Sequence, residues 1–182
     1  GFDLVADGLL VDIIRRVSVF GMSLVPLDIR EESTLHTAAL DALTQHLGIG
    51  SYSEWDEEAR LSWLTSELSS KRPLFRIREI ESLGFDDSVV KTLITFLVAS
   101  ELHPEALGAY VISQAQQASD VLAVMLLQKQ FGMTPSSGKM MRVVPLFETL
   151  DDLNRGSSVL ETLFSIPLYV DIVKGKIEVM VG

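Results

Sequence analysis

Residues 108–147 read GAYVISQAQQASDVLAVMLLQKQFGMTPSSGKMMRVVPLF, and this stretch decides the fold class. Its two ends, 108–113 and 142–147, are short apolar runs containing β-branched residues, which is typical of buried strands. Between them, Ser119 is placed to cap a helix over 120–131. A strand, a helix and a second strand in this order predict two parallel strands joined by a crossover.

The same alternation extends outward in both directions. We expect helical segments over 149–174, then a strand over 176–181, and upstream a buried strand over 22–29. Further helices are predicted over 2–20, 32–47, 53–68 with Ser53 as cap, and about 86–102, with a loop over 74–85. Near-continuous apolar strands that alternate with helices indicate a parallel sheet buried on both faces. Four such strands suggest an α/β fold that forms part of a (β/α)8 TIM-like barrel with extra helices.

Polar residues follow the predicted strands at the edge where barrel enzymes carry their functional groups. Asp28 and Arg30 lie at the carboxyl end of the first strand, Ser113 and Gln114 lie at the end of the second, and Glu148 follows the third. An arginine and a carboxylate on different strand ends would converge across one mouth, which suits a phosphate and a divalent cation. The alternative is that each charge is merely solvated, and pattern alone favours that interpretation.

Composition argues against several classes of function. The 182 residues carry a net charge of −10 without a cluster of Lys and Arg, so we expect no nucleic-acid binding. The absence of cysteine removes disulfides, thiol catalysis and thiolate metal sites. Charged residues interrupt each apolar stretch before the roughly 20 residues needed to span a bilayer, so we expect no membrane association. The start of the chain does not resemble a secretion signal.

The chain nevertheless has 47% hydrophobic residues and a mean hydropathy of +0.30, which is high for a soluble protein. It lacks an initiator Met, and it starts and stops inside patterned sequence. We therefore expect an internal piece of a longer chain, whose excess apolar surface packs against the missing parts.

Longer sequence motifs carry more specific evidence about function. Residues 25–33 (VPLDIREES), followed by 36–37 (HT) and 47–50 (LGIG), resemble a signature of the phosphoenolpyruvate carboxylases. Further matches follow in the same order, at 70–74 (SKRPL), 109–113 (AYVIS), 119–124 (SDVLAV), 144–148 (VPLFE), 175–176 (GK) and 179–182 (VMVG). Because these collinear matches cover nearly the whole chain, chance similarity is implausible.

The resemblance implies a large, mainly helical enzyme with a central eight-stranded barrel. Residues 1–182 would be one partial domain, the middle portion of that catalytic barrel. Such enzymes are cytoplasmic homotetramers that need Mg2+ or Mn2+. They convert phosphoenolpyruvate and bicarbonate into oxaloacetate and phosphate, through carboxyphosphate and a metal-bound enolate. The family's catalytic histidine, second metal carboxylate and Gly-rich arginine loop would lie outside this chain, so the chain alone is expected to be inactive.

The resemblance also implies roles for four residues. Arg30 matches the arginine that holds the substrate phosphate, a task that the guanidinium fork suits. Glu148 matches a carboxylate ligand of the divalent metal. Leu146 and Met180 match positions that line the apolar pocket retaining CO2. From the residues alone, ordinary barrel core is the simpler interpretation of both.

Two residues depart from the family pattern. Glu31 stands where the family usually has Gln and would place negative charge beside the phosphate-binding arginine, and Leu35 replaces a basic residue.

The sequence contains three histidines. His36, one turn into a helix, is expected to make a structural hydrogen bond, with support of the site as the alternative. His46 and His103 are expected to face solvent at helix ends.

Two other interpretations stay open. One is a non-catalytic helical interaction module, in which the apolar strands are helix segments and the excess hydrophobicity forms a groove for a partner. The other is a different metal-assisted barrel lyase, or a phosphotransferase that uses phosphoenolpyruvate.

Overall fold

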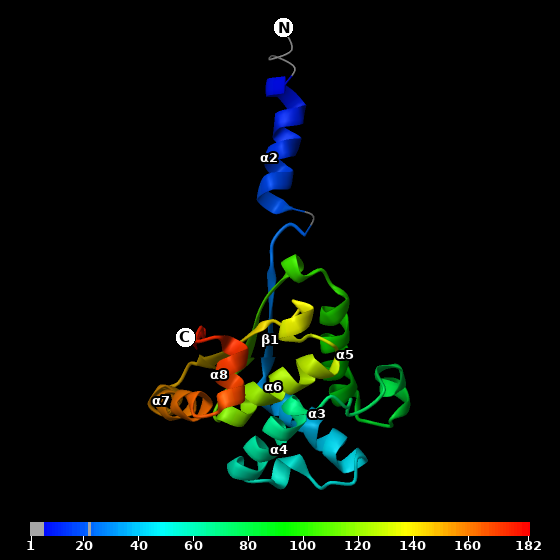
Figure 1. Cartoon of the computed structure of the whole chain (residues 1–182), viewed down its shortest axis with the longest axis vertical. Coiled ribbons are helices and arrows are strands. Elements are labelled where there is room, and N and C mark those ends of the chain that lie inside the picture. The colour runs from blue at the N-terminus through cyan, green and yellow to red at the C-terminus, as the bar shows by residue number, and fades with distance from the viewer. Residues whose placement is uncertain (1–5, 22) are drawn as a thin grey trace.

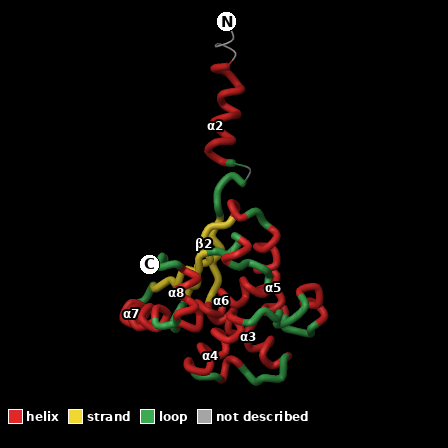
Figure 2. Tube along the Cα trace, viewed as in Figure 1, coloured by secondary structure: helices red, strands yellow, loops and turns green. Residues whose placement is uncertain are grey.

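A parallel sheet lies at the centre of the chain. The computed structural model describes residues 6–21 and 23–182. Four strands lie side by side in sequence order, and every neighbouring pair is parallel: β1 (Leu27–Glu32), β2 (Leu107–Ser113), β3 (Arg142–Phe147) and β4 (Met180–Val181). Figure 2 shows the strands in yellow, with helices packed beside them. The predicted α/β fold with parallel strands is confirmed, as an open sheet among the described residues.

One helix precedes the sheet, and the others connect its strands. They are α2 (Val11–Phe20), α3 (Ser33–His46), α4 (Glu57–Ser69), α5 (Asp87–Glu101), α6 (Ala118–Gln130), α7 (Leu150–Phe164) and α8 (Pro167–Val173). Short π or 3-10 turns occur at Ala6–Leu10, Tyr52–Glu54, Ile77–Ser82, Pro104–Ala106 and Pro135–Ser137. The predicted loop over 74–85 therefore contains one of these turns.

Strand alternation sends successive side chains of the sheet into two different cores. On β2, Tyr110 and Ile112 enter the main core, which residues of α3 to α8 complete. The opposite face carries a smaller cluster of Ala109, Val111, Val144 and Leu146, with Met180 packed against it. No helix contributes to this second cluster in the described part of the chain. The sheet is thus apolar on both faces, but helices cover only one.

The first strand begins later than predicted. The sequence predicts a strand over 22–29, of which Met22 lies outside the described residues, but β1 runs over Leu27–Glu32. Leu24 has a φ of 62°, so the chain turns there instead of extending, and pairing with β2 begins at Leu27. Because β1 is an edge strand here, Leu27 stays 67% exposed, and the predicted burial on both faces is wrong for this strand.

The fourth strand is shorter than the predicted 176–181 and comprises only Met180–Val181. Lys174 and Gly175 have φ values of 51° and 72° and turn the chain after α8, so it joins β3 only near the carboxyl end of that strand.

Two helices begin at a different residue from the predicted one. Asp56, not Ser53, caps α4, because its Oδ1 accepts the N–H of Ala59 at 2.9 Å. Gln117 is the N-cap residue of α6, and Ser119 lies inside the first turn. Side-chain acceptors of this kind satisfy N–H groups that have no partner within the helix.

The helical segments predicted over 149–174 are the two helices α7 and α8. Pro167 disfavours a helical conformation of Ile166, which has φ −94° and ψ 106°, and α7 and α8 meet at 94°. Among residues 6–21 and 23–182, no single helix is long and apolar enough to cross a membrane. The bent pair α7 and α8 meets that criterion by length and composition only.

Helix α2 projects away from the rest of the chain (Figure 1). Within the predicted helix over 2–20, residues 6–20 are helical with a break at Gly8, and residues 2–5 lie outside the described part. No residue of α2 is buried, and Ile13, Ile14 and Val17 are each more than half exposed. Its apolar stripe therefore has no partner among the described residues.

Candidate active site at the carboxyl edge of the sheet

Arg30 contacts Glu148 at the carboxyl edge of the sheet. Arg30 Nη2 donates to Glu148 Oε1 at 2.6 Å, although 118 positions separate the two residues. Arg30 comes from β1 and Glu148 directly follows β3, so the ion pair bridges β2. The predicted convergence of an arginine and a carboxylate is confirmed. The two side chains remain 54% and 44% exposed, so both can still reach a ligand.

Arg30 is a residue of β1 itself, whereas the sequence predicted that it directly follows the strand. It is the register partner of Val111, which in turn pairs with Val144, so Arg30 shares the face of the second cluster. Asp28 does not join the ion pair. Its Oδ1 accepts the N–H of Ala109 at 2.6 Å, where the register between β1 and β2 shifts.

Leu146 and Met180 lie next to each other on the same face. They are register partners on β3 and β4; Leu146 is 1% exposed, and Met180 packs against the cluster to which it belongs. Glu148 follows Leu146 by two positions, so this apolar pair borders the Arg30–Glu148 contact. The structure thus brings the four predicted site residues together.

Gly182 supports Glu148 from the side of β4. The N–H of Gly182 donates to the carbonyl of Phe147 at 3.1 Å, and the Glu148 side chain lies over the glycine. A Cβ at position 182 would come within 2.9 Å of Glu148 Cγ. Only glycine therefore fits there without moving Glu148.

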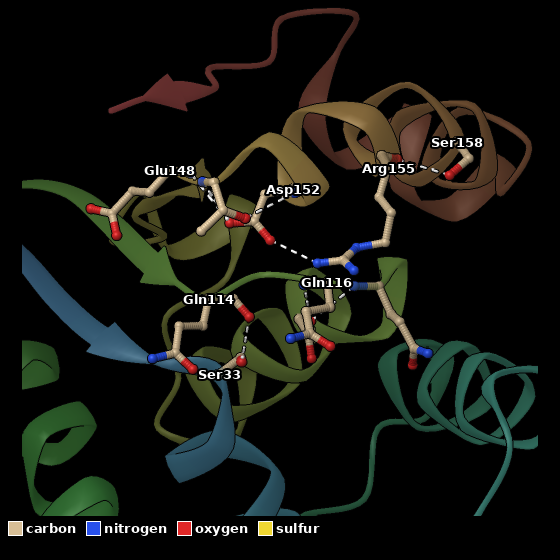
Figure 3. Close-up of polar contacts among 10 residues, drawn as sticks. Ser33, Gln114, Gln116, Glu148, Asp152, Arg155 and Ser158 are labelled. Carbon is tan, nitrogen blue, oxygen red and sulfur yellow. Dashed lines mark hydrogen bonds and ion pairs between the residues drawn. The ribbon is translucent and has the colours of Figure 1, made fainter.

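Asp152 closes the loop between β3 and α7 (Figure 3). Its Oδ2 accepts the N–H of Thr149 at 3.0 Å and that of Glu148 at 3.4 Å, and its Oδ1 accepts from Arg155 at 2.7 Å. The Thr149 hydroxyl accepts the N–H of Asp152 in return, at 3.1 Å, which completes a capping box. These hydrogen bonds, first of all those with Thr149, hold the pKa of Asp152 below its ordinary value.

The loop between β2 and α6 closes in the same way. Asp120 Oδ2 accepts the N–H groups of Gln116 and Gln117 at 2.8 and 3.0 Å. Here burial has the larger effect and raises the pKa of Asp120. Gln114 has a φ of 55°, and its carbonyl accepts from the Ser33 hydroxyl at 2.8 Å. This loop and the start of α3 border a polar hollow of about 250 Å³.

Glu31 points away from Arg30. Neighbouring residues of a strand alternate between faces, and Glu31 Oε2 accepts the Tyr110 hydroxyl at 2.6 Å on the side of the main core. The buried His36 has its Nε2 2.9 Å from that hydroxyl and 3.6 Å from Glu31 Oε2. Burial alone would raise the pKa of Glu31, but the nearby His36 and the hydrogen bond from Tyr110 outweigh it and lower the pKa. The expected hydrogen bond of His36 is confirmed, and the expected charge beside Arg30 is wrong.

The other two histidines are where the sequence places them. His46 is the last residue of α3 and His103 directly precedes the turn Pro104–Ala106, and both are exposed. Leu35 is half-buried on α3.

Glu148 fits a divalent cation as one ligand and not as a complete site. Its carboxylate supplies the hard oxygen atoms that Mg2+ prefers, and it already holds a cation, the guanidinium of Arg30. No group of three His, Cys, Asp or Glu side chains that could hold a metal ion occurs among residues 6–21 and 23–182.

The chain was compared with models of known protein families. The family model for phosphoenolpyruvate carboxylase matches residues 1–182, the whole chain. The chain belongs to the phosphoenolpyruvate carboxylase family. This membership contradicts the interpretation as a non-catalytic helical interaction module. The structure contradicts it as well, because the apolar segments are strands of one parallel sheet and not helices.

Three carboxylases illustrate the extent of the similarity. Phosphoenolpyruvate carboxylase 2 of Arabidopsis thaliana is 52% identical over 178 residues, the C4 phosphoenolpyruvate carboxylase of Flaveria trinervia 50% over 182, and the Nicotiana tabacum enzyme 52% over 178. These matches cover 98%, 100% and 98% of this chain, but 18% of each relative. The chain thus spans less than a fifth of the length of these carboxylases.

Two residues that support the site in this carboxylase segment, Asp152 and Tyr110, were not predicted from the sequence. Asp152 did carry a signal, because Thr149-x-x-Asp152 directly after a strand is a capping-box pattern. Tyr110 carried none, since its role depends on a contact with Glu31, 79 residues away.

Proposed function

We propose that this chain forms part of the active-site wall of a phosphoenolpyruvate carboxylase, which makes oxaloacetate and phosphate from phosphoenolpyruvate and bicarbonate. The observation that carries the proposal is the 2.6 Å contact between Arg30 and Glu148. A phosphate-binding type of cation and a metal-binding type of anion stand together at the edge where barrel enzymes bind their substrates. Family membership supports this reaction, and the contact between Arg30 and Glu148 supports its location at the carboxyl edge of the sheet.

The ion pair exchanges both of its partners when the site fills. Because each side chain is about half exposed, the pair contributes only about 0–1 kcal/mol. The substrate phosphate replaces Glu148 as the anion on Arg30, where the planar fork donates to two phosphate oxygens. Glu148 would then be free to hold Mg2+ or Mn2+ as one carboxylate ligand. A bound divalent cation supplies electrostatic stabilisation of negative charge on the substrate oxygen.

Leu146 and Met180 form the apolar wall beside these charges. Their side chains offer no hydrogen bond and exclude water, which suits a pocket that retains CO2 next to the carbon it will join. An uncharged, apolar molecule gains nothing from the ion pair, so a separate apolar surface is needed to hold it.

The sheet continues, in this proposal, into a closed (β/α)8 barrel of which residues 1–182 are one partial domain. Two features support this: β1 and β4 are edge strands among the described residues, and the second cluster has no helical cover. The family resemblance supports a cytoplasmic homotetramer as the working form.

Glu148→Gln in a full-length carboxylase that contains this segment tests the proposal. The substitution keeps the shape and removes the charge, so the Mg2+ concentration for half-maximal activity should rise at least about tenfold and kcat should fall. Glu178→Gln is the matched control, because Glu178 also pairs with an arginine, Arg142 at 2.8 Å, but at the start of β3. Identical kinetics of the two variants would show that Glu148 is not a metal ligand.

A further inference from the structure

The side chain of Glu148 is held loosely, whereas its backbone is held firmly. The contact with Arg30 is half exposed and is expected to be exchanged when ligands bind. The backbone of residues 148–149, by contrast, donates two N–H groups to Asp152 Oδ2, at 3.4 and 3.0 Å. The direction in which Glu148 leaves β3 is therefore set by Asp152.

Asp152 is buried, and hydrogen bonds hold its backbone and both of its carboxylate oxygens. It is 7% exposed; its Oδ1 is bound by Arg155 at 2.7 Å, and its own N–H is bound by the Thr149 hydroxyl at 3.1 Å. Figure 3 shows Asp152 between Glu148 and Arg155. Because both carboxylate oxygens are engaged, a rotation of the side chain would break its contacts with the loop or with Arg155.

The neighbouring loop shows what helix capping alone looks like. Asp120 binds the N–H groups of Gln116 and Gln117 as Asp152 binds those of Glu148 and Thr149. Gln116 takes the place of Glu148 in that loop, four positions before the aspartate, and it carries no charge. The same arrangement thus presents a carboxylate in one loop and an amide in the other.

We propose that Asp152, locked by Arg155, is the positioning residue that holds Glu148 where it binds the divalent cation. This inference rests on the metal role of Glu148 given under the proposed function. A ligand must stay within about 0.5 Å of its productive place, so freedom in the backbone of residues 148–149 is enough to weaken the site. Asp152 acts through that backbone and leaves the ligand itself unchanged.

Titration of Mn2+ into the full-length carboxylase, with free Mn2+ followed by electron paramagnetic resonance, tests this without turnover. Asp152→Asn keeps the volume but removes one acceptor oxygen, so either the ties to the loop or the contact with Arg155 must be lost. The Kd for Mn2+ should rise about tenfold, the size typical of residues that orient a ligand. Arg155→Gln is the milder second variant: it leaves the capping box intact and should raise the Kd in the same direction by a smaller factor.

Asp120→Asn is the matched control, since it removes the same kind of loop closure from a loop without a ligand. It should lower the melting temperature but leave the Kd for Mn2+ unchanged. Equal shifts of the Kd in Asp120→Asn and Asp152→Asn, or an unchanged Kd in Asp152→Asn, would overturn the inference when Glu148→Gln does raise the Kd. If Glu148→Gln leaves the Kd unchanged, the metal role of Glu148 itself is refuted.

Discussion

The Tyr110 hydroxyl donates a hydrogen bond to Glu31 Oε2, with 2.6 Å between the two oxygen atoms. An ionised carboxylate can only accept, so the Tyr110 oxygen is left to accept from His36 Nε2, 2.9 Å away. This assigns a proton to Nε2 of His36. The network joins β1, β2 and α3 on the face opposite the candidate site, and so fixes which way Arg30 points.

The Glu31 network makes stability depend on pH. Because the pKa of Glu31 is lowered, its carboxylate stabilises the fold above the ordinary value of 4.5, and this contribution is lost as the pH falls from there through the folded pKa. Glu31→Gln should therefore lower the melting temperature at neutral pH, and the difference from the parent chain should shrink below about pH 4.5. Melting followed by circular dichroism over a pH series measures this. A difference independent of pH would show that the charge of Glu31 contributes nothing.

Arg30→Ala should mainly weaken capture of phosphoenolpyruvate by the full-length enzyme. A contact to a phosphate that is present before and during the reaction is uniform binding, so KM should rise by at least about tenfold while kcat changes less. Arg30→Lys should recover only part of the loss, because a point charge cannot reproduce the fork. Arg142→Ala, at the other end of the sheet, is the control. Steady-state kinetics in which kcat alone fell would contradict the phosphate role.

Gly182→Ala should act on the metal requirement through Glu148. The added Cβ would lie 2.9 Å from Glu148 Cγ, so the glutamate must move. We expect a higher Mg2+ concentration for half-maximal activity in the full-length enzyme, as for Glu148→Gln. At Gly8 an added Cβ meets nothing within 4 Å, so Gly8→Ala is the control. An unchanged Mg2+ requirement in Gly182→Ala would mean that the position of Glu148 is not critical.

The 182-residue chain by itself should show no carboxylase activity. Its described residues contain no group of three side chains able to hold a metal ion, and one carboxylate binds Mg2+ weakly. An assay coupled to oxaloacetate reduction should stay at background. Turnover at a thousandth of the roughly 10 s⁻¹ typical of enzymes would show that the site is more self-contained than proposed.

The centre of the fold could be predicted from sequence because its signals are local. β2, β3 and α6 lie within one or two residues of their predicted bounds, since each is a continuous apolar run with clear ends. β1 was harder to place, because its start depends on the turn at Leu24 and on pairing with a strand that lies far along the chain. Pairing over such distances leaves no local trace in the sequence.

One part of the candidate site could be predicted from the sequence, and another part could not. Strand order alone predicts that Arg30 and Glu148 approach each other, because carboxyl ends of parallel strands share an edge. The orientation of Glu31 could not be predicted, since the strand was expected to end at Ile29, and alternation beyond its end has no meaning. With β1 placed at Leu27–Glu32, the same rule puts Arg30 and Glu31 on opposite faces.

The order of the strands also bears on how the chain folds. The connection from β2 to β3 contains one long helix, α6, whereas the connection from β1 to β2 contains α3, α4 and α5. Closing the shorter loop loses less chain entropy, so β2, α6 and β3 are expected to form the nucleus of the sheet. β1 is synthesised first, but we expect it to join after this nucleus, so that Arg30 reaches Glu148 only once β2, α6 and β3 have formed.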